Sequence, residues 1–525
     1  MPKVLIADNL SPRAAEVFAR RGLDADTRVG LKPAELIAAI PEYDGLAVRS
    51  ATKVTAEVLA AAEKLKVVGR AGIGVDNIDV GAATARGVCV MNTPFGNAIT
   101  TAEHSIAMML ALARQIAAAD RSTQAGKWEK SAFMGVELYG KTLGIVGCGN
   151  IGSIVADRAL GLKMHVVAYD PYLSEDRARD LGVEKVDLDE LYARADIVTL
   201  HAPATETTTR MIDAKAIAKM RPGVRIVNCA RGELVVEADL RAGLDSGHVA
   251  GLAIDVFATE PARENVLFGH PNLLATPHLG AATAEAQENV ALQVAEQMSD
   301  FLIDGAVTNA VNMASVTAEE APRLRPYLAL ARLLGSFAGQ LTESAIKAVH
   351  IEFEGHAATL NTRPLVSVVL EGLLSPLLDN VNMVNAPLIA RQRDIDVKET
   401  RDERPGDYQT LIRVTVTTER QSRNVAGTLF ADSRPRLVEI KGIHLEAEAA
   451  PHMLYLTNED KPGFIGALGT TLGDAGVNIA TFHLGRAAPG GDAIALIAVD
   501  QPLDAAVLAR VRALPHVVQA KPLAF

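Results

Sequence analysis

The sequence predicts an α/β protein, in which helices pack against doubly wound parallel sheets and further sheets follow toward the C-terminus. Two patterns carry this prediction. Up to Asn309, short apolar runs alternate with helical patterns, which is the order of strands and helices in a parallel sheet. Residues 453–525 instead show the order β-α-β-β-α-β, which is typical of the ferredoxin-like arrangement. An aromatic content of only 4%, with abundant Ala and Val, suits helices packed on buried parallel strands.

Length and charge limit the classes of protein that fit. A chain of 525 residues is too long for one ordinary core and should hold three or four domains. Its formal net charge of −11, with no basic run to offset it, argues against a nucleic-acid partner. The three cysteines are widely spaced, which indicates the reduced thiols of a cytoplasmic protein. A strand begins at Lys3 and no apolar run reaches membrane-spanning length, so we expect neither a signal peptide nor a membrane anchor.

The first hundred residues predict a small α/β domain that binds an anion. Apolar runs at residues 4–7, 45–48 and 67–70 are separated by helical patterns. The last two runs lead to Arg49 and Arg70, at the strand ends where ligands of open α/β sheets bind. Solvated surface arginines are common, but a glycine-rich loop follows Arg70 and exposes backbone N–H groups. Both arginines are therefore expected to face an anion.

A connecting region follows this domain. Residues 100–113 form an apolar helical pattern that joins it to the next domain. The only tryptophan, Trp128, lies in a polar loop. It fits two interpretations equally well: a lid over the core, or an anchor at an interface.

The most specific motif is a glycine-rich turn between a strand and a helix. Apolar residues 143–146 are followed by Gly147, Gly149 and Gly152 in the spacing G-x-G-x-x-G. The first glycine permits a tight turn, the second lets a pyrophosphate approach the backbone, and the third lets the helix pack closely. Asp170 ends the next strand, where its carboxylate can bind an adenosine ribose and repel a 2′-phosphate. Spaced glycines can mark only a structural turn, but this context predicts a dinucleotide site that prefers NAD to NADP.

Four later strand ends carry ionisable residues to the same edge of the predicted sheet, and these residues are Arg231, Asp255, Glu260 and His278. His278 is the natural proton acceptor for oxidation of a hydroxyl group, since an imidazole ordinarily titrates at about pH 6.5. Glu260 would hold the imidazole in one tautomer. Arg231 would form two parallel hydrogen bonds to a substrate carboxylate. The alternative is that these residues form buried ion pairs and helix caps.

Beyond Asn309 the alternation stops. Residues 325–342 predict a helix, and residues 348–354 and 411–417 predict strands. None of these segments has catalytic spacing.

Five segments resemble the signatures of the D-isomer-specific 2-hydroxyacid dehydrogenases, particularly the members that act on 3-phospho-D-glycerate. These segments are residues 70–77, 92–97, 228–232, 255–261 and 276–281. The resemblance covers the whole chain. It implies a Rossmann-like doubly wound parallel sheet inserted in a second, flavodoxin-like α/β domain, followed by an α+β intervening domain and a ferredoxin-like ACT domain.

The resemblance also implies the boundaries of these domains. Residues 1–97 and 283–311 would form the substrate-binding domain, residues 98–282 the dinucleotide-binding domain, residues 318–450 the intervening domain and residues 453–525 the ACT-like regulatory domain. The intervening domain would act as a spacer or as an anion sensor.

Site residues follow from the motifs and the resemblance together. The expected catalytic residues are Arg231, Glu260 and His278. Contacts to NAD are expected from Gly147, Gly149, Asn150, Ile151, Gly152, Asp170, Ala202, Cys229, Ala230, Arg231, Asp255, His278, Gly280 and Ala281. Contacts to substrate are expected from Arg49, Ser50, Arg70, Ile73, Gly74, Asn97 and Lys130, with Arg49 and Arg70 holding the phosphate. At the position of Lys130, some relatives have an arginine that reaches the phosphate from the partner subunit. The resemblance also implies that the loop around Trp128 reaches across a dimer.

The implied reaction is the oxidation of 3-phospho-D-glycerate to 3-phosphooxypyruvate with NAD, the first step of L-serine biosynthesis, by a homo-dimer or homo-tetramer. L-Serine is a possible effector, held by Asn458, Asp460 and Asn478 between paired ACT-like copies, unless these residues only cap turns. Two other functions stay open. One is another D-2-hydroxyacid dehydrogenase, such as a glyoxylate reductase. Arg49, Arg70 and the ACT-like C-terminal residues argue against that function. The other is a non-catalytic NADH-sensing regulator, against which the intact Arg, Glu and His set counts.

Overall fold

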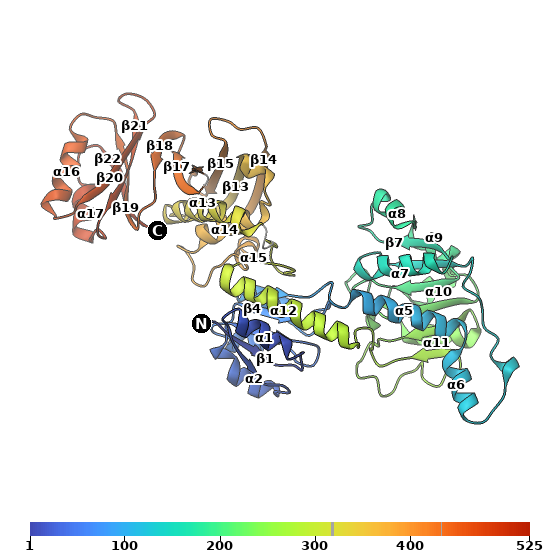
Figure 1. The fold of residues 1–525 in the computed structure, drawn as a ribbon. Helices are drawn as coiled ribbons and strands as arrows, with labels where there is room; N and C mark the ends of the chain where they lie inside the picture. The colour runs from blue at the N-terminus through green and yellow to red at the C-terminus, as the bar shows by residue number, and fades with distance from the viewer. Residues whose placement is uncertain (317–319, 432) are drawn as a thin grey trace.

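The computed structural model of the protein describes residues 1–316, 320–431 and 433–525, which form four β-sheets (Figure 1). The predicted first residue of the intervening domain, residue 318, lies outside the described residues. Two parallel sheets come from the N-terminal part of the chain and two largely antiparallel sheets from the C-terminal part. The α/β class predicted from the sequence is confirmed.

The first sheet has five parallel strands in the order β2-β1-β3-β4-β5, which is the flavodoxin-like order. Its strands are β1 (Lys3–Ile6), β2 (Asp24–Thr27), β3 (Gly45–Val48), β4 (Val67–Arg70) and β5 (Cys89–Met91). Its helices are α1 (Arg13–Arg20), α2 (Pro33–Ala39), α3 (Ala56–Ala61) and α4 (Val80–Ala85), with the 3-10 turn η1 (Ile40–Glu42). A distant helix, α12 (Ala284–Asp304), completes this core. A Cβ on Gly69 of β4 would lie 2.2 Å from Met298 of α12, so the strand needs glycine for α12 to pack this closely.

The second sheet has seven parallel strands in the order β12-β11-β10-β9-β6-β7-β8. Its strands are β6 (Thr142–Val146), β7 (His165–Tyr169), β8 (Glu184–Lys185), β9 (Ile197–Leu200), β10 (Val224–Asn228), β11 (Val249–Ile254) and β12 (Leu273–Ala275). The flanking helices are α5 (Ala98–Ala113), α7 (Asn150–Gly161), α8 (Glu175–Leu181), α9 (Leu188–Arg194), α10 (Ala214–Lys219) and α11 (Glu237–Ser246), with the 3-10 turn η3 (Gly232–Leu234). The strand order reverses between β6 and β9, and such a reversal opens a crevice at the carboxyl edge of a parallel sheet.

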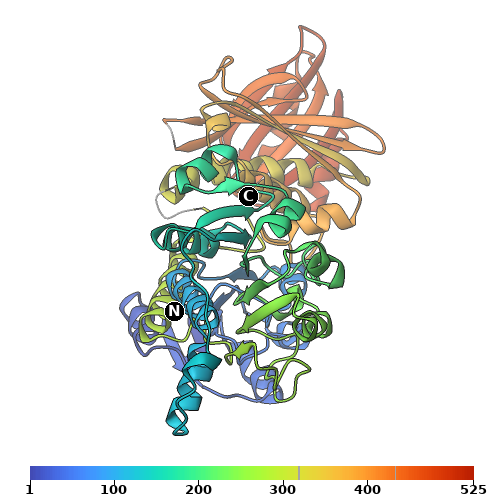
Figure 2. The ribbon, with the colours of Figure 1, turned by 90° about the vertical axis from the view of Figure 1, so that its right-hand side faces the viewer.

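Helices α5 and α12 connect the two parallel sheets, and the chain passes from one sheet to the other along them (Figure 1). Helix α6 (Ile116–Gln124) and the loop with the 3-10 turn η2 (Lys130–Ala132) then extend away from the body of the second sheet (Figures 1 and 2).

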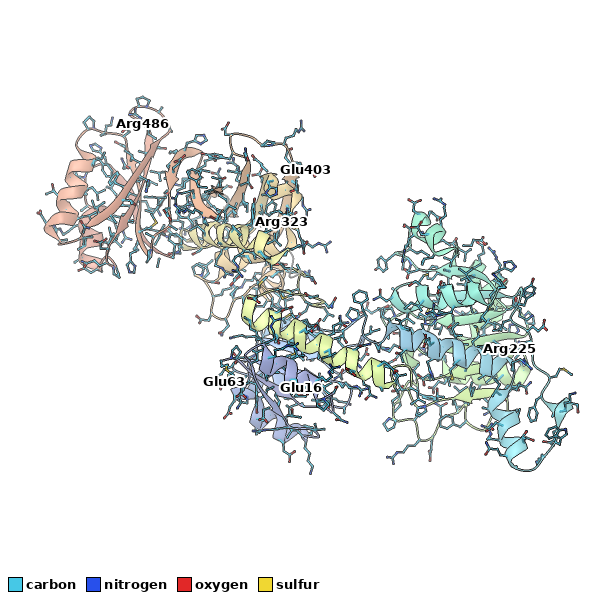
Figure 3. The ribbon with its side chains drawn as sticks, viewed as in Figure 1. Glu16, Glu63, Arg225, Arg323, Glu403 and Arg486 are labelled. Atoms are coloured by element: carbon cyan, nitrogen blue, oxygen red, sulfur yellow. The ribbon has the colours of Figure 1, made fainter. Side chains whose placement is uncertain are left out.

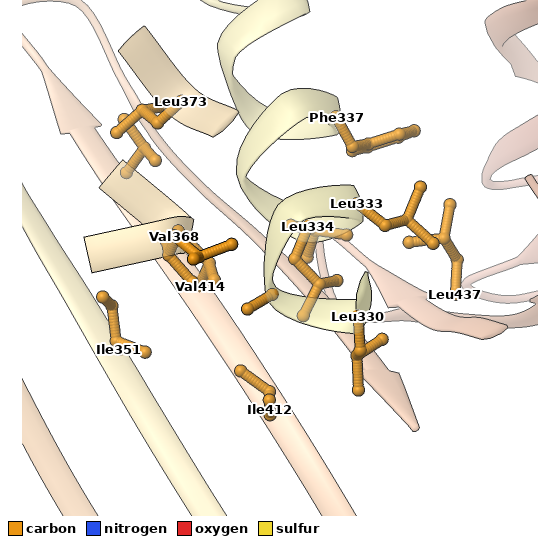
Figure 4. Packing of buried hydrophobic residues seen from close by; sticks show 14 of the residues in the cluster. Leu330, Leu333, Leu334, Phe337, Ile351, Val368, Leu373, Ile412, Val414 and Leu437 are labelled. Atoms are coloured by element: carbon orange, nitrogen blue, oxygen red, sulfur yellow. The ribbon is translucent and has the colours of Figure 1, made fainter. Parts of the chain in front are cut away.

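The third sheet has six strands in the order β14-β13-β15-β16-β17-β18, with only β13 and β14 parallel. Its strands are β13 (Ile346–Gly355), β14 (Asp396–Asp402), β15 (Thr410–Thr418), β16 (Ser422–Phe430), β17 (Arg434–Ile440) and β18 (Ile443–Ala447). Its helices are α13 (Ala321–Gln340), α14 (Arg363–Leu374) and α15 (Ala386–Gln392), with the 3-10 turn η4 (His356–Thr359). Helix α13 begins four residues before the predicted stretch, since Pro322 fits the first turn, where no backbone N–H is needed. Leu330, Leu334 and Phe337 of α13 pack into this core (Figure 4).

The fourth sheet has the order β20-β21-β19-β22, which confirms the predicted ferredoxin-like arrangement. It is built from β19 (His452–Glu459), α16 (Phe464–Asp474), β20 (Ile479–Arg486), β21 (Asp492–Val499), α17 (Ala505–Arg512) and β22 (Val517–Ala524). One face of the sheet covers α16 and α17, whereas the other packs on α13, where the rings of Tyr455 and Phe337 meet edge to face at 5.8 Å. The third and fourth sheets therefore share one apolar core and lie together at one end of the molecule (Figure 2).

Glycines set the close crossing of α13 and α14. A Cβ on Gly335 would lie 2.3 Å from the Val369 carbonyl oxygen, and one on Gly339 would lie 2.3 Å from the Leu373 carbonyl oxygen. Atoms cannot approach this closely, so any larger side chain must push the two helices apart.

We expect Gly335→Ala to destabilise the pair of helices by about 1–3 kcal/mol, because overpacking outweighs the gain of about 1 kcal/mol in helix propensity. The matched control is Gly469→Ala in α16, where an added Cβ meets no atom within 4 Å, and it should be neutral or stabilising. Hydrogen exchange of the backbone amides of α13 and α14 measures the effect. Equal protection in the two variants would contradict the packing constraint.

Candidate active site

The glycine-rich turn after β6 has the geometry of a phosphate cradle. Gly147 has a φ of +90°, and a Cβ there would lie 2.8 Å from the carbonyl oxygen of His201. A Cβ on Gly152 would lie 2.0 Å from the Gly147 carbonyl oxygen, so only glycine lets α7 begin this close to the strand. At Gly149, by contrast, an added Cβ would meet no atom within 4 Å. The backbone at Gly149 thus borders open space next to the N-terminus of α7, which suits a pyrophosphate.

Asp170 lies directly beside this turn. Its Oδ2 accepts a hydrogen bond from the backbone N–H of Cys148 at 2.8 Å, and its Oδ1 accepts one from Tyr172 at 2.8 Å. These bonds fix the carboxylate while leaving acceptor capacity for ribose hydroxyls. Burial, followed by the charge of Asp170, raises the pKa of Cys148 to about 11, so this thiol stays protonated.

The predicted NAD contacts all lie at the carboxyl edge of the second sheet, because its strands are parallel. Gly147, Gly149, Asn150, Ile151 and Gly152 follow β6, Asp170 follows β7, Ala202 follows β9, Cys229, Ala230 and Arg231 follow β10, Asp255 follows β11, and His278, Gly280 and Ala281 follow β12. The side chain of Asn150 also reaches the segment between β5 and α5, where its Nδ2 lies 3.5 Å from the Pro94 carbonyl oxygen. The residues present thus fit a dinucleotide.

His278 and Glu260 are hydrogen-bonded to each other at this edge. The Nδ1 of His278 lies 2.7 Å from Oε2 of Glu260, and Oε1 of Glu260 accepts a hydrogen bond from the backbone N–H of Phe257 at 3.0 Å. The Glu260 side chain is therefore held from both sides. His278 is half exposed, at 51%, and its Nε2 remains available for a ligand. The structure brings these two predicted residues together.

Asp255 holds the turn that carries His278. The Asp255 side chain is fully buried, and it accepts hydrogen bonds from the Thr276 hydroxyl at 2.6 Å and from the backbone N–H groups of Leu279 at 2.8 Å and Gly280 at 2.9 Å. The turn places His278 in the left-handed region, with a φ of +54°. Burial opposes ionisation of Asp255, but hydrogen bonds from His104, Thr276 and Leu279 hold its pKa below the usual value.

His104 is a neighbour that sequence analysis missed. Its Nε2 lies 3.3 Å from Oδ1 of Asp255 and 3.4 Å from the Thr276 hydroxyl. It lies on the apolar helix α5, far away in the sequence, and no local motif marks it. Cys229 lies near the same pair, and His104, Cys229 and Asp255 bring one ligand atom each within 4.8 Å. The N–H groups already bound to Asp255 leave little room for a cation, so we assign the cluster no metal.

Arg231 links the two parallel sheets. Its Nε donates to Oδ2 of Asp76 at 3.0 Å, and its Nη1 donates to the Ala230 carbonyl oxygen at 2.7 Å. A Cβ on Gly74 would lie 1.8 Å from Nη2 of Arg231, so the glycine lets the guanidinium lie against this loop. Asp76 follows β4. It lies in residues 70–77, one of the five segments that resemble the family, but its role as the partner of Arg231 was not predicted.

Arg49 and Arg70 stand close to Arg231 and form a positively charged cluster. Burial, followed by repulsion from Arg231, lowers the pKa of Arg70 to about 10, with a further lowering by Arg49. The buried Nε of Arg70 has no hydrogen-bond partner among the residues that the structure describes. The backbone N–H of Arg49 donates to the buried Asp8 at 2.6 Å, which fixes the end of β3. Crowded arginines with an unsatisfied donor fit a doubly charged anion.

The remaining predicted substrate residues differ in their exposure and in their distance from the arginines. Ser50 is exposed and Ile73 half-buried on the loops that carry the arginines. Asn97 is buried before α5, and its Oδ1 has no partner among the described residues. Lys130 is exposed in η2, on the loop that extends away from the first sheet (Figure 1), so one chain alone does not bring it to the cluster. Trp128 is 88% exposed in the same loop.

The three predicted effector residues do not meet within one chain. Asp460 accepts hydrogen bonds from Arg486, at 2.9 Å, and from the backbone N–H of Gly490, at 3.0 Å. Arg486 ends β20 at the tip of its hairpin (Figure 3), whereas Asn478 precedes the first residue of the same strand and donates to Asp500 at 2.7 Å. Asp460 and Asn478 thus lie about 25 Å apart, the length of β20. Asn458 is buried, and its Oδ1 has no partner among the described residues.

No helix in the described ranges combines the length and the apolar composition needed to span a membrane.

Comparisons with known proteins bear on the whole chain. The family model for the D-isomer specific 2-hydroxyacid dehydrogenase NAD binding domain matches residues 106–280. The model for the D-3-phosphoglycerate dehydrogenase intervening domain matches residues 323–441, and the ACT domain model matches residues 452–516.

Full-length relatives agree with these matches. D-3-phosphoglycerate dehydrogenase of Archaeoglobus fulgidus is 41% identical over 522 residues, 99% of each chain. The Synechocystis protein of the same name is 42% identical over 513 residues, 97% of this chain and 92% of the relative. Among solved structures, NAD+-bound 3-phosphoglycerate dehydrogenase of Entamoeba histolytica matches 59% of this chain and 98% of its own, with a TM-score of 0.51 and 30% identity. The cofactor is NAD, as predicted, and the chain belongs to the D-3-phosphoglycerate dehydrogenase family of the D-isomer-specific 2-hydroxyacid dehydrogenases.

Proposed function

We propose that the protein oxidises 3-phospho-D-glycerate to 3-phosphooxypyruvate with NAD, in the first step of L-serine biosynthesis. Two observations carry the proposal: Arg70 lies close enough to Arg231 and Arg49 for their charges to act on it, and His278 pairs with Glu260 at the edge of the NAD-binding sheet that also carries Arg231. A substrate that carries both a carboxylate and a phosphate needs more than one such cation. The relatives named D-3-phosphoglycerate dehydrogenase support the same substrate.

The reaction then follows from the positions of the side chains. Arg231, oriented by Asp76, binds the substrate carboxylate, while Arg49 and Arg70 bind the phosphate. This leaves the hydroxyl group between them near His278, whose Nε2 accepts its proton. Glu260 keeps the opposite nitrogen protonated and stabilises the imidazolium that forms. NAD, when bound, supplies the hydride acceptor.

The domain division is part of the proposal. Residues 1–97 and 283–311 serve as the substrate-binding domain, since α12 returns to pack on the first sheet. Residues 98–282 bind NAD, and residues 318–450 and 453–525 form the intervening and regulatory parts. Asp170 favours NAD over NADP, since its carboxylate stands beside the turn and would repel a 2′-phosphate.

Assembly and regulation complete the proposal. Trp128 and Lys130, on an exposed loop, contact a partner subunit in a homo-dimer or homo-tetramer. L-Serine binds where Asp460 of one copy approaches Asn478 of another, because the two lie at opposite ends of β20 in one chain. The protein works in the cytoplasm, where its buried cysteines Cys89, Cys148 and Cys229 remain reduced thiols.

The substrate assignment is tested by following NADH formation from 3-phospho-D-glycerate and D-lactate. The protein should prefer the phosphorylated acid. Arg70→Gln should raise KM for this acid by about 10-fold or more, because one charge-assisted contact to the phosphate is lost. Arg86→Gln, at an exposed arginine beyond α4, is the control and should change little. Equal use of both acids by the unaltered protein would sink the assignment.

For the proton acceptor, His278→Ala should lower kcat by about 10²- to 10⁴-fold while NAD still binds, since general base catalysis is lost. His165→Ala, at an exposed histidine beginning β7, provides the control. Fluorescence of bound NADH and turnover are measured together. A near-normal kcat in His278→Ala would rule out this role.

Regulation gives a further expected outcome. L-Serine should inhibit the full chain, and Asp460→Ala should abolish the inhibition while dehydrogenase activity remains, because coupling between sites is typically worth only about 1–3 kcal/mol. Asp474→Ala, at an exposed end of α16, should stay sensitive. Inhibition that survives unchanged in Asp460→Ala would exclude this effector site.

A further inference from the structure

Helix α5 brings a histidine to the turn that carries His278. The helix is apolar and packs against β10, β11 and β12 of the second sheet. The side chain of His104 on this helix is only 19% exposed. Its Nε2 lies 3.3 Å from Oδ1 of Asp255 and 3.4 Å from the hydroxyl oxygen of Thr276. A polar ring on an apolar helix thus meets the buried carboxylate that organises the turn.

The contact between His104 and Asp255 has a defined direction. Burial opposes ionisation of Asp255, but hydrogen bonds from His104, Thr276 and Leu279 hold its pKa below the usual value. An ionised carboxylate can only accept hydrogen bonds. The Nε2 of His104 must therefore carry a hydrogen and donate it to Asp255.

The other ionisable side chain of this cluster does not supply a charge. Cys229 faces Asp255 from the end of β10. Burial raises the pKa of this thiol to about 12, so it stays protonated and neutral. The carboxylate of Asp255 thus depends on the hydrogen bonds that it accepts, and His104 supplies one of them.

Asp255 passes this constraint on to His278. Its carboxylate accepts hydrogen bonds from the backbone N–H groups of Leu279 and Gly280, and its carbonyl oxygen accepts one from the N–H of His278 at 2.8 Å. The φ of His278 is +54°, which a residue other than glycine keeps only where surrounding contacts hold it. A shift of Asp255 would therefore turn the imidazole of His278 away from Glu260.

The packing of α5 fixes where His104 meets the turn. Thr101, His104 and Met108 lie on one face of the helix, because they are three and four residues apart. The hydroxyl of Thr276 lies 3.8 Å from the sulfur of Met108, and a Cβ on Gly280 would lie 3.4 Å from Cγ2 of Thr101. The residues on either side of His104 are thus in contact with the same turn.

We propose that His104 is a positioning residue for the proton transfer. Its imidazole donates to Asp255, and Asp255 holds the turn in the conformation that presents His278 to the substrate hydroxyl group. His104 acts through Asp255 and not on the substrate itself. The inference rests on the proposed role of His278 as the proton acceptor, and it adds to that role a residue from a distant helix.

The test removes the donor of His104 while the packing is kept. His104→Phe retains a ring without an N–H group, whereas His104→Gln keeps an amide donor near the place of Nε2. His104→Phe should lower kcat for 3-phospho-D-glycerate by about 10-fold and leave its KM nearly unchanged, because a misplaced reacting group costs rate and not binding. His104→Gln should restore most of the lost kcat. His165→Phe, the same change at an exposed histidine that begins β7, is the control and should have a normal kcat.

Thermal unfolding of the same variants separates positioning from folding. The Phe and Gln variants should have similar Tm values but different kcat values. His104→Leu, which also lacks a donor, takes the place of His104→Phe if that variant fails to fold. A kcat that is equal in the variants with and without a donor would overturn the positioning role.

Failure of the proposed function would give a different result. If the unaltered protein prefers D-lactate, the substrate assignment is wrong, and the variants are then compared with D-lactate. A near-normal kcat in His278→Ala would remove the proton acceptor, and this inference with it. A normal kcat in His104→Phe together with a large loss in His278→Ala would overturn the role of His104 alone.

Discussion

The carboxylate of Asp255 is the interaction on which the candidate active site depends. A buried charge without partners costs several kcal/mol, so Asp255 can stay ionised only where N–H and O–H donors surround it. Thr276, Leu279 and Gly280 supply those donors, and in doing so they wrap the chain after β12 around the end of β11. The same wrapping puts His278 into a left-handed conformation within reach of Glu260. The geometry of the proposed proton acceptor is thus set by a residue that touches neither its ring nor its partner.

A second constraint joins the substrate and cofactor sides. Arg231 belongs to the cofactor sheet, but its guanidinium lies against Gly74 and pairs with Asp76 of the first sheet. The pair is largely exposed on the Asp76 side, at 68%, so solvent screens it and it adds little stability. Its effect is on orientation. With α5 and α12 as the other links, it aligns the guanidinium beside Arg70 before a substrate arrives.

Sequence reasoning predicted those features that depend on local pattern. The glycines of the turn, Asp170, and the residues at strand ends could be found because a parallel sheet brings its carboxyl ends to one edge. His104 could not, since it lies on an apolar helix and meets Asp255 only after the chain has folded. The same holds for Phe337 and Tyr455, which lie far apart in the sequence and meet in one core. Local motifs report the chemistry of single turns, whereas contacts between distant segments depend on packing that no spacing encodes.

The C-terminal sheets place a physical condition on any regulation. Asp460 already pairs with Arg486. An amino-acid effector must therefore either displace the Arg486 guanidinium or bind to that guanidinium through the effector's own carboxylate. The second route keeps both charges paired, since the effector amino group can then neutralise Asp460 while Arg486 holds the effector carboxylate. Binding of this kind alters activity only if it prefers one arrangement of the sheets. The apolar core shared with α13 joins β19 to the third sheet, so a shift of β19 would move Tyr455 against Phe337.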